Sequence, residues 1–460
     1  GLAGAMLGLT FLIDPRWLIP AALMGAAYTG KCLAHSQPKR QRIGIGRGLL
    51  ACLIALGVAA PALVPLLELM PQTTRWDMTA PVAEEISLPP VRLFGAVLFD
   101  GGGPPETQTY LGATVVLLLA VGAAASVRRG RFWTATLVAG LLLALGSFTP
   151  LYGWVMRVVP GMSSLRVPAR FYLIVALAAA MLVGHGFDHL RGVASDARAA
   201  RRVRLVAVGV GTLVLALSLL AFIARIRQPG ATAVAQSWAA VGGGILACAV
   251  AGCVLTIAKG TPAARVASTA VVMLIAIDLA IANAFTLRVE PAEAALSTSA
   301  CALAGEAGVL GTRRIFSPSY SVPQQAAQLC GLELADGVNP LQLTAYWEFM
   351  ASATGFPTES YSVTLPPFVD GDVRLNWHPA IDADALGLLS VERIVSAYPL
   401  HAPDVELVGE QDGQWIYRNL QARPRAWIEP EGASDGEWRS VAAYEWTPNR
   451  IRIRVDGPGR

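Results

Sequence analysis

The first 285 residues consist of long apolar runs separated by polar loops, and this pattern constrains the fold more than any other feature. A helix that crosses a bilayer needs about 20 mostly apolar residues, because its backbone polar groups must be satisfied within the helix. We predict a polytopic α-helical membrane bundle of about nine spans, in contact with the lipid bilayer. Gly244, Cys248 and Gly252 form a small-residue stripe that favours close helix packing. The predicted spans are 1–13 (incomplete), 17–33, 45–70, 110–127, 132–148, 171–187, 205–223, 239–257 and 266–285.

From residue 286 the sequence changes to that of a soluble protein. Only 15% of the whole chain is charged, against about 25% in soluble domains, and the shortfall lies in the first 285 residues. We therefore predict a transmembrane helical domain at 1–285 and a mixed α/β domain at 286–460. Strands are expected at 314–316 and 393–396, and the second domain should also contain two β-hairpins. These hairpins turn at Gln411-Asp412-Gly413 and at Thr447-Pro448-Asn449-Arg450.

The distribution of basic residues over the loops predicts an orientation, because Lys and Arg mark the cytoplasmic side. One set of alternate loops is basic, and the opposite set is richer in acids. With nine spans in alternation, residue 1 lies inside and everything after residue 285 lies outside. The basic loops hold Lys31, Lys39, Arg40, Arg42, Arg47, Arg128, Arg129, Arg131, Arg191, Arg198, Arg201, Arg202, Arg204, Lys259 and Arg265. The opposite loops hold Asp14, Asp77, Glu84, Glu85, Asp100 and Glu106.

The sequence argues against several other classes. A net charge of +4, carried by loop arginines, does not suit a nucleic-acid-binding protein. The six cysteines form no CxxC or Cys/His cluster, which argues against a zinc site. Cys301 and Cys330 could form a disulfide if the second domain lies outside the cytoplasm. Gly101-Gly102-Gly103 precedes two prolines rather than a helix, which disfavours a nucleotide-binding loop.

Several motifs resemble those of a known family. Arg166-Val167-Pro168-Ala169-Arg170-Phe171 leads into a helix that ends at Gly184-His185-Gly186. The second domain contains Val391-Glu392-Arg393-Ile394-Val395-Ser396, then Trp415-Ile416-Tyr417-Arg418-Asn419 followed by Arg423-Pro424-Arg425-Ala426-Trp427. In this order and spacing the motifs resemble the YfhO-type bacterial membrane proteins, which are similar to the GT-C class of polyprenyl-sugar glycosyltransferases.

The resemblance implies a GT-C-like bundle in the bacterial inner membrane, with the C-terminal domain outside the cytoplasm. It also implies a role in cell-envelope glycan modification, with a polyprenyl-phosphate sugar as donor. GT-C enzymes carry a catalytic acid in their first outer loop, so the resemblance places the main base upstream of Gly1. Because the chain starts without Met in an apolar run and stops just after a strand, we expect a fragment truncated at both ends. The resemblance leaves open whether the chain is an enzyme and whether a divalent metal is its cofactor.

Sugar transfer from a polyprenyl phosphate needs a carboxylate that takes the proton from the acceptor hydroxyl. Asp77, Glu84 and Glu85 lie in the long outer loop and are weak catalytic candidates, although solvated loop acids are the plainer interpretation. Transfer also needs cations that stabilise the departing phosphate.

Arg166 and Arg170 flank Pro168 where the chain re-enters the membrane, and two guanidinium groups there could hold a lipid phosphate. Arg75 is a third candidate for phosphate binding. Interfacial anchoring or a salt bridge is the plainer interpretation of all three arginines. Asp278 lies within the last predicted span, where an acid costs about 2.5–3.5 kcal/mol and is a functional candidate by default. Burial of Asp278 against a polar neighbour, or its protonation, is the plainer account.

Three functions are consistent with these features. The first is a GT-C-like glycosyltransferase, or a relative of one, acting on polyprenyl-linked sugars. The second is a non-catalytic membrane scaffold whose outer domain binds glycans or proteins. The third is a lipid flippase or transporter, which ranks last because it predicts several charges deep in the spans and only Asp278 qualifies.

Overall fold

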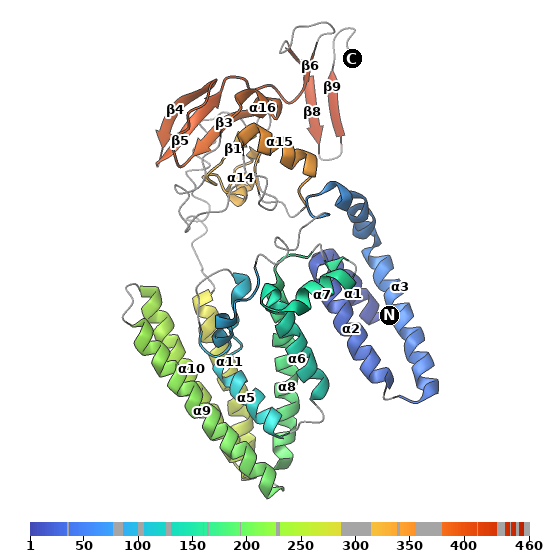
Figure 1. Cartoon of the computed structure of the whole chain (residues 1–460), viewed down its shortest axis with the longest axis vertical. Helices are drawn as coiled ribbons and strands as arrows, with labels where there is room; N and C mark the ends of the chain where they lie inside the picture. The colour runs from blue at the N-terminus through green and yellow to red at the C-terminus, as the bar shows by residue number, and fades with distance from the viewer. Residues whose placement is uncertain are drawn as a thin grey trace. The chain divides into compact units, whose positions relative to one another are not determined.

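A computed structural model of the chain contains two compact units (Figure 1). The first comprises Gly1–Leu66 and Met78–Val289, and the second comprises Leu67–Asp77 and Glu290–Arg460. The segment Leu67–Asp77 was expected in the membrane domain, yet it packs with the second unit. The structure describes residues 1–34, 36–76, 86–99, 105–125, 130–159, 161–162, 165–193, 195–226, 231–286, 314–337, 341–355, 380–411, 413–429, 438–441, 443–447 and 450–454.

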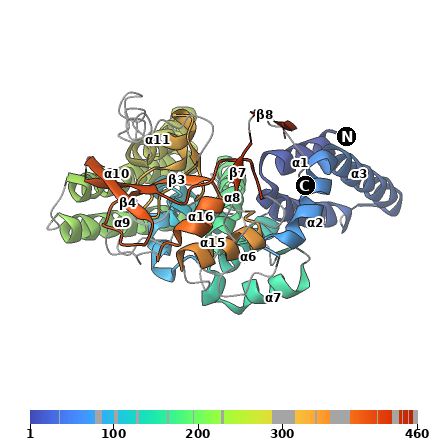
Figure 2. The ribbon, with the colours of Figure 1, turned by 90° about the horizontal axis from the view of Figure 1, so that it is seen from above.

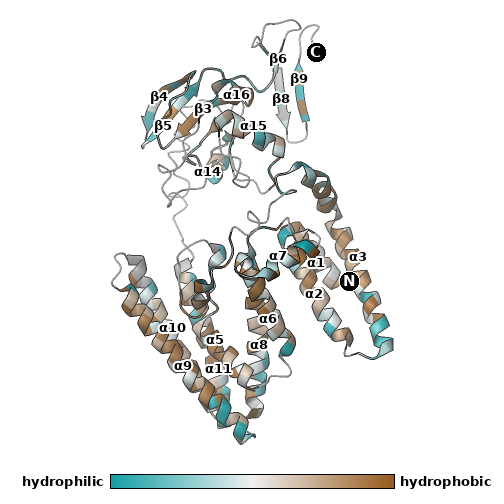
Figure 3. Ribbon diagram, viewed as in Figure 1, coloured by the Kyte–Doolittle hydropathy of each residue, from teal (hydrophilic) through white to brown (hydrophobic). Residues whose placement is uncertain are grey.

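Each of the nine predicted spans falls on a helix of the first unit. Among the described residues, five helices are long and apolar enough to cross a membrane, which indicates a multi-pass membrane protein. The five are α3 (Pro38–Leu69), α8 (Tyr172–Val193), α9 (Ala197–Arg225), α10 (Ala231–Ala258) and α11 (Ala264–Thr286). The other four are shorter: α1 (Leu2–Ile13), α2 (Leu18–Ala34), α5 (Ala113–Ala125) and α6 (Arg131–Ala144). Figure 3 shows these helices as largely hydrophobic, with hydrophilic residues gathered towards several helix ends.

Small residues allow the helices of the first unit to approach closely. A Cβ atom added to Gly186 of α8 would overlap the Cα atom of Gly122 in α5, so the two backbones are in direct contact. Helices α9 and α10 lie side by side in both views (Figures 1 and 2). Between them, the Sγ atom of Cys248 lies 3.7 Å from the carbonyl oxygen of Gly211. The predicted stripe therefore contributes Gly244 and Cys248 to this contact, whereas a Cβ atom at Gly252 would meet no described neighbour within 4 Å.

Short helices cap one end of the first unit. They are η1 (Pro15–Trp17), η3 (Pro90–Ala96), η4 (Pro105–Thr107), η5 (Gly146–Phe148), α7 (Pro150–Val158) and η7 (Pro168–Phe171). Each of them except η5 has a proline in its first turn, where the missing backbone N–H costs nothing. Helix α7 is amphipathic, because it buries Tyr152 completely and exposes Trp154. Tyr152 packs against Phe171 and Leu88 in a common core that ties these short helices together.

The second unit is built on a five-stranded mixed sheet. The strand order is β2 (Glu333–Leu334), β1 (Arg314–Phe316), β3 (Val391–Ser396), β5 (Gln414–Asn419) and β4 (Val405–Gln411). Strand β1 is parallel to β2 and β3, while β5 is antiparallel to β3 and β4. The predicted mixed α/β architecture, the strand at 314–316 and the first hairpin are confirmed.

Alternate residues of the sheet point into two cores. Phe316 and Ile394 pack with α15 (Thr344–Thr354) and α16 (Ala383–Leu388) on one face. Ile315 and Val395 pack with α14 (Gln324–Leu329) on the other face. The unit therefore has three layers, helix–sheet–helix. The rest of the unit adds two smaller pairings, β6 (Trp427–Ile428) with β7 (Arg439–Ser440), and the second predicted hairpin, β8 (Ala443–Thr447) with β9 (Arg450–Arg454).

Backbone pairing explains why Leu67–Asp77 belongs to the second unit. After η2 (Met70–Gln72), Thr73 forms an antiparallel bridge with Leu343. The amide of Thr74 donates a hydrogen bond to the carbonyl oxygen of Gln342 at 3.0 Å. Thus the chain adds a short strand to the second unit before it returns to the first, a long-range pairing that no local sequence pattern reveals.

One cysteine of the second unit is cross-linked. Cys330, directly after α14, is disulfide-bonded. Cys301, its predicted partner, lies outside the described residues. Cys32, Cys52, Cys248 and Cys253 are free, and all four belong to the first unit.

Candidate functional site

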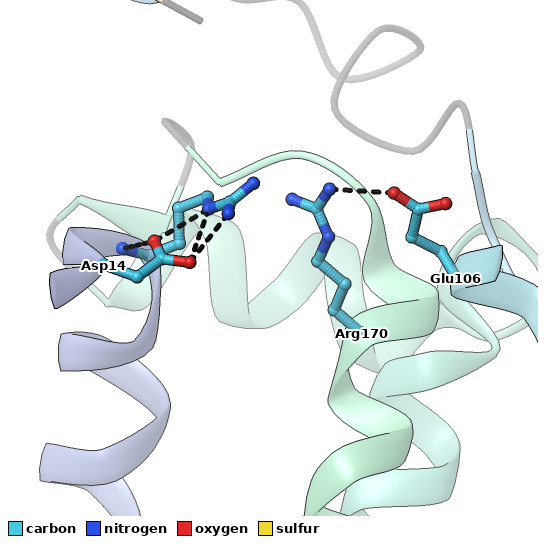
Figure 4. A network of polar contacts seen from close by, with 4 residues as sticks. Asp14, Glu106 and Arg170 are labelled. Carbon is cyan, nitrogen blue, oxygen red and sulfur yellow. Dashed lines mark hydrogen bonds and ion pairs between the residues drawn. The ribbon is translucent and has the colours of Figure 1, made fainter. Parts of the chain in front are cut away.

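Charged side chains from three separate loops meet at the capped end of the first unit. They come from the start of η1, from η4, and from η7 with the segment that leads into it (Figure 4). In sequence the three loops lie about 60 to 90 residues apart, so only the fold brings them together. We call Asp14, Arg16, Glu106, Arg166 and Arg170 the arginine–carboxylate cluster.

Asp14 and Arg16 form a local ion pair at the start of η1. The Asp14 carboxylate caps η1 by accepting a hydrogen bond from the Arg16 backbone amide at 3.1 Å. The Arg16 guanidinium adds two parallel contacts, from Nε to Oδ1 at 2.8 Å and from Nη2 to Oδ2 at 2.7 Å. This fork geometry is the strong form of an arginine–carboxylate pair.

Arg170 and Glu106 form the second ion pair. The Arg170 Nη2 atom lies 3.0 Å from Glu106 Oε1, and each side chain is 28% exposed. Figure 4 shows the Arg170 side chain between Asp14 and Glu106. Arg170 therefore links the two carboxylates, one by direct contact and the other through the electrostatic field.

Backbone strain lies between the two arginines that the sequence singled out. Val167 has φ of 70° and ψ of 73°, in the left-handed region that β-branched residues rarely adopt. Such a conformation costs about 1–3 kcal/mol and persists only where the surroundings enforce it. Here the side chain of Val167 is buried in the core, and Pro168 fixes the following turn. The strained residue thereby sets the direction in which Arg166 and Arg170 leave the backbone.

The cluster borders a narrow cleft. Arg16, Arg166 and Arg170 line it together with the apolar residues Trp17 and Phe171. Its volume is about 20 Å³, close to the space of one water molecule. A phosphate group would enter only if a guanidinium group first moved off its carboxylate.

Both carboxylates are held in the ionised form. Hydrogen bonds from the Arg16 side chain lower the pKa of Asp14, partial burial opposes the shift, and the fields of Arg16 and Arg170 add to it. For Glu106, partial burial acts to raise the pKa, but its own backbone amide and Arg170 outweigh that effect, so the pKa is lowered. At neutral pH each carboxylate is therefore ionised and holds its arginine partner.

Asp278 forms a separate polar site inside the helical bundle. Its side chain is 2% exposed and accepts hydrogen bonds from the Tyr110 hydroxyl at 2.5 Å and from the Thr114 hydroxyl at 2.7 Å. The backbone amide of Thr114, in the first turn of α5, donates a third bond at 3.0 Å. Asp278 therefore caps the N-terminus of α5 from another helix, where a negative charge is favourable. Asp278 is thus buried against polar neighbours, as the plainer interpretation of the sequence predicted.

The structure brings some of the other predicted residues together and separates the rest. Arg166 and Arg170 line the same cleft, whereas Arg75 belongs to the second unit. Asp77, Glu84 and Glu85 lie outside the described residues. Among the described residues, no group of three His, Cys, Asp or Glu side chains could hold a metal ion.

Sequence reasoning missed the roles of Asp14, Arg16 and Glu106. It treated the two acids only as part of the charge of the outer loops. A local signal existed at Asp14, because Asp followed by Pro marks a helix N-cap. No signal pairs Glu106 with Arg170, since 64 residues separate them.

The motifs of the second unit hold its fold together. The Asn419 amide donates hydrogen bonds to the carbonyl oxygens of Ala383 at 2.8 Å and Val391 at 3.0 Å, and so joins α16 to β3. Arg423 is largely buried, with a contact to Asp384 at 3.2 Å and its guanidinium 4.9 Å from the centre of the Trp427 ring. These contacts stabilise the packing of the second unit.

In comparisons with known proteins, the chain matches no family model, no curated protein and no solved structure. The resemblance to YfhO-type proteins therefore stays a prediction. Any function proposed for the chain is supported by the geometry of the arginine–carboxylate cluster and by that resemblance.

Proposed function

We propose that the chain is a bacterial inner-membrane protein with nine spans whose second unit lies outside the cytoplasm. Loops predicted on one side meet at one helix end, because Asp14, Glu106 and Arg170 form one cluster. Loops predicted on the opposite side meet elsewhere: the Lys31 amine lies 4.9 Å from the centre of the Phe132 ring. The disulfide at Cys330 supports an oxidising compartment for the second unit.

Cysteine labelling in intact cells tests this orientation. A cysteine at Gln411, in the second unit, should react with a membrane-impermeant thiol reagent. A cysteine at Arg201, near the basic start of α9, should react only after the membrane is opened. The reverse pattern would overturn the orientation.

The function that the cluster supports best is a GT-C-like glycosyltransferase, or a relative, that uses a polyprenyl-phosphate sugar. The observation that carries this proposal is the convergence of three arginines and two carboxylates beside the helix ends, where a lipid headgroup would lie. Arginine forks suit phosphate oxygens, and an ionised carboxylate suits proton removal. Arg166 and Arg170 would hold the phosphate, with Arg16 joining once it leaves Asp14.

The proposed reaction transfers the sugar from phosphate to a hydroxyl. The acceptor oxygen forms a bond to the anomeric carbon as the bond from that carbon to the phosphate oxygen breaks. The electron pair leaves with the lipid phosphate, whose growing charge the arginines stabilise. The acceptor proton passes to a carboxylate. The resemblance places that carboxylate upstream of Gly1, and the geometry of the described residues offers a second position for it in the arginine–carboxylate cluster. Glu106 suits this role better than Asp14, because Arg16 already contacts both oxygens of Asp14.

A transfer assay tests this assignment. The full chain in detergent would be incubated with a radiolabelled polyprenyl-phosphate sugar and an acceptor. E106Q should lower turnover at least about a hundredfold, since general bases contribute about 10² to 10⁴. E348Q, which changes an exposed acid of the second unit, should leave turnover unchanged. Undiminished turnover by E106Q would contradict the role of Glu106.

One observation favours the scaffold as the second candidate. The cleft is nearly closed, and both carboxylates are paired with arginines, which is also how a purely structural network looks. Transfer of sugar would decide against the scaffold. The flippase is the weakest alternative, because the Asp278 side chain already accepts three hydrogen bonds within the bundle.

A further inference from the structure

A larger cavity lies beside the segment that comes after Glu106. Its volume is about 340 Å³, within the usual range for small-ligand sites and far above the 20 Å³ of the arginine cleft. One wall is η3 with the residues just after it, and the other is the segment 107–110. Arg225, at the end of α9, completes the lining. We call this space the η3 cavity.

Hydrogen bonds fix the walls of the η3 cavity. The Thr109 hydroxyl donates to the carbonyl oxygen of Arg92 at 2.5 Å, which joins the two walls. The Arg225 guanidinium donates to the carbonyl oxygen of Phe99 at 2.8 Å. Gly95 allows the close approach, since a Cβ atom there would overlap the Thr109 hydroxyl oxygen. The cavity is therefore formed in advance of any ligand, which reduces the cost of binding.

The lining indicates the chemistry of the ligand. Arg92 and Arg225 both contribute to it, and no acidic residue is among the lining residues that the structure describes. Gln108 adds a polar side chain to the lining, whereas the Tyr110 hydroxyl already donates to Asp278. At η3, Val91 is 69% exposed and lies on the lining, so an apolar surface adjoins the polar interior. Two arginines on one lining favour a phosphate group, and the apolar border favours an attached lipid chain.

We propose that the η3 cavity binds the phosphorylated headgroup of a second lipid, distinct from the sugar donor. The binding site stands on the cavity alone. Its role rests on the proposed function: the acceptor would itself be lipid-linked and would meet the donor near Glu106, which precedes Thr107 of the cavity lining and contacts Arg170 of the arginine cleft.

A titration with phosphatidylglycerol tests the proposal, because its headgroup carries both a phosphate and hydroxyl groups. Lipid bound to the full chain in detergent would be counted by native mass spectrometry. R92Q/R225Q should lower the affinity at least about tenfold, as expected for charge-assisted contacts. V91W, which blocks the border and keeps both arginines, should lower it similarly. R157Q, an exposed arginine of α7 outside both clefts, should bind like the wild type.

Two further experiments distinguish a lipid in the η3 cavity from a lipid in the arginine cleft and from free phosphate. R166Q/R170Q should keep phosphatidylglycerol in the η3 cavity even if it loses the polyprenyl phosphate, so the two sites can fail independently. Inorganic phosphate at millimolar concentration should not displace the lipid; if it does, the cavity is a site for free phosphate and the lipid assignment is overturned. Unchanged affinity in both R92Q/R225Q and V91W would also overturn it.

Discussion

The first unit places its carboxylates in two contrasting environments. Asp278 lies inside the bundle, with three hydrogen-bond donors around it and almost no exposed surface. Asp14 and Glu106 lie at the helix ends, partly exposed and paired with arginines that can rotate away. Asp278 therefore caps the start of α5, whereas Asp14 and Glu106 carry their charges close to the protein surface.

These two environments indicate which of the three acids is available to react with a ligand. Asp278 accepts three hydrogen bonds and so stabilises the fold. A movement of its carboxylate would leave the N-terminus of α5 without its cap. A partly exposed ion pair is screened by solvent and contributes little to the stability of the fold. The predicted intramembrane position alone had made Asp278 a functional candidate, yet the described contacts favour the arginine–carboxylate cluster.

The largest effect is expected from Asp278→Ala. The substitution leaves the Tyr110 hydroxyl and both Thr114 donors without their acceptor, so the free energy of unfolding should fall by about 3–5 kcal/mol. Asp278→Asn keeps an acceptor oxygen and should cost less. Thermal unfolding in detergent measures both. Equal stability of Asp278→Ala and the wild type would show that Asp278 does not act as a structural cap of α5.

Asp336 of the second unit is a buried acid that, unlike Asp278, has few hydrogen-bond partners. Asp336 is 9% exposed, the Ser317 amide donates to its Oδ1 at 3.2 Å, and its Oδ2 has no partner among the described residues. Burial raises the pKa of Asp336 to about 7 from an ordinary 3.8, against the effect of backbone hydrogen bonds. The folded state therefore binds its proton more tightly than the unfolded state.

Stability of the second unit should accordingly fall as pH rises from about 4 to 7, and level off above 7. The shift corresponds to about 4 kcal/mol at most. Asp336→Asn should remove this fall, while E348Q should retain it. Denaturant unfolding of the full chain at pH 5 and pH 8 gives the comparison, and an unchanged pH dependence in Asp336→Asn would refute the assignment.

The smallest effects are expected at the cluster itself. Asp14→Asn and Glu106→Gln should each change the free energy of unfolding by less than about 1 kcal/mol, because exposed ion pairs are screened by solvent. The same thermal unfolding experiment serves. A loss comparable to that of Asp278→Ala would show that the cluster is a structural network and would favour the scaffold.

Much of the fold could be predicted from the sequence. The apolar helices of the first unit, the strand at 314–316 and both hairpins result from local periodicity and turn residues, which act over a few neighbours. The docking of Thr73 against Leu343 could not be predicted, since backbone pairing carries no side-chain pattern. Likewise Gly122 and Gly186 are far apart in the sequence, and neither is part of a motif. Their importance for the close packing of α5 and α8 is visible only in the folded structure.

The candidate site was predicted only in part. Arg166 and Arg170 stood out because they flank a proline at the point where the chain re-enters the membrane. Their partners Asp14 and Glu106 come from distant loops, and single acids in loops look alike in a sequence. Cavities are harder still, because the η3 cavity depends on how three segments pack.

The most direct test of the central claim is the affinity of the full chain for a polyprenyl phosphate. Arg166→Ala and Arg170→Ala should each weaken binding about tenfold to a hundredfold, the worth of one charge-assisted contact. Arg157→Ala, at an exposed position on α7, should bind as the wild type does. Equal affinities for all three variants and the wild type would contradict the account and return Arg166 and Arg170 to a purely structural role.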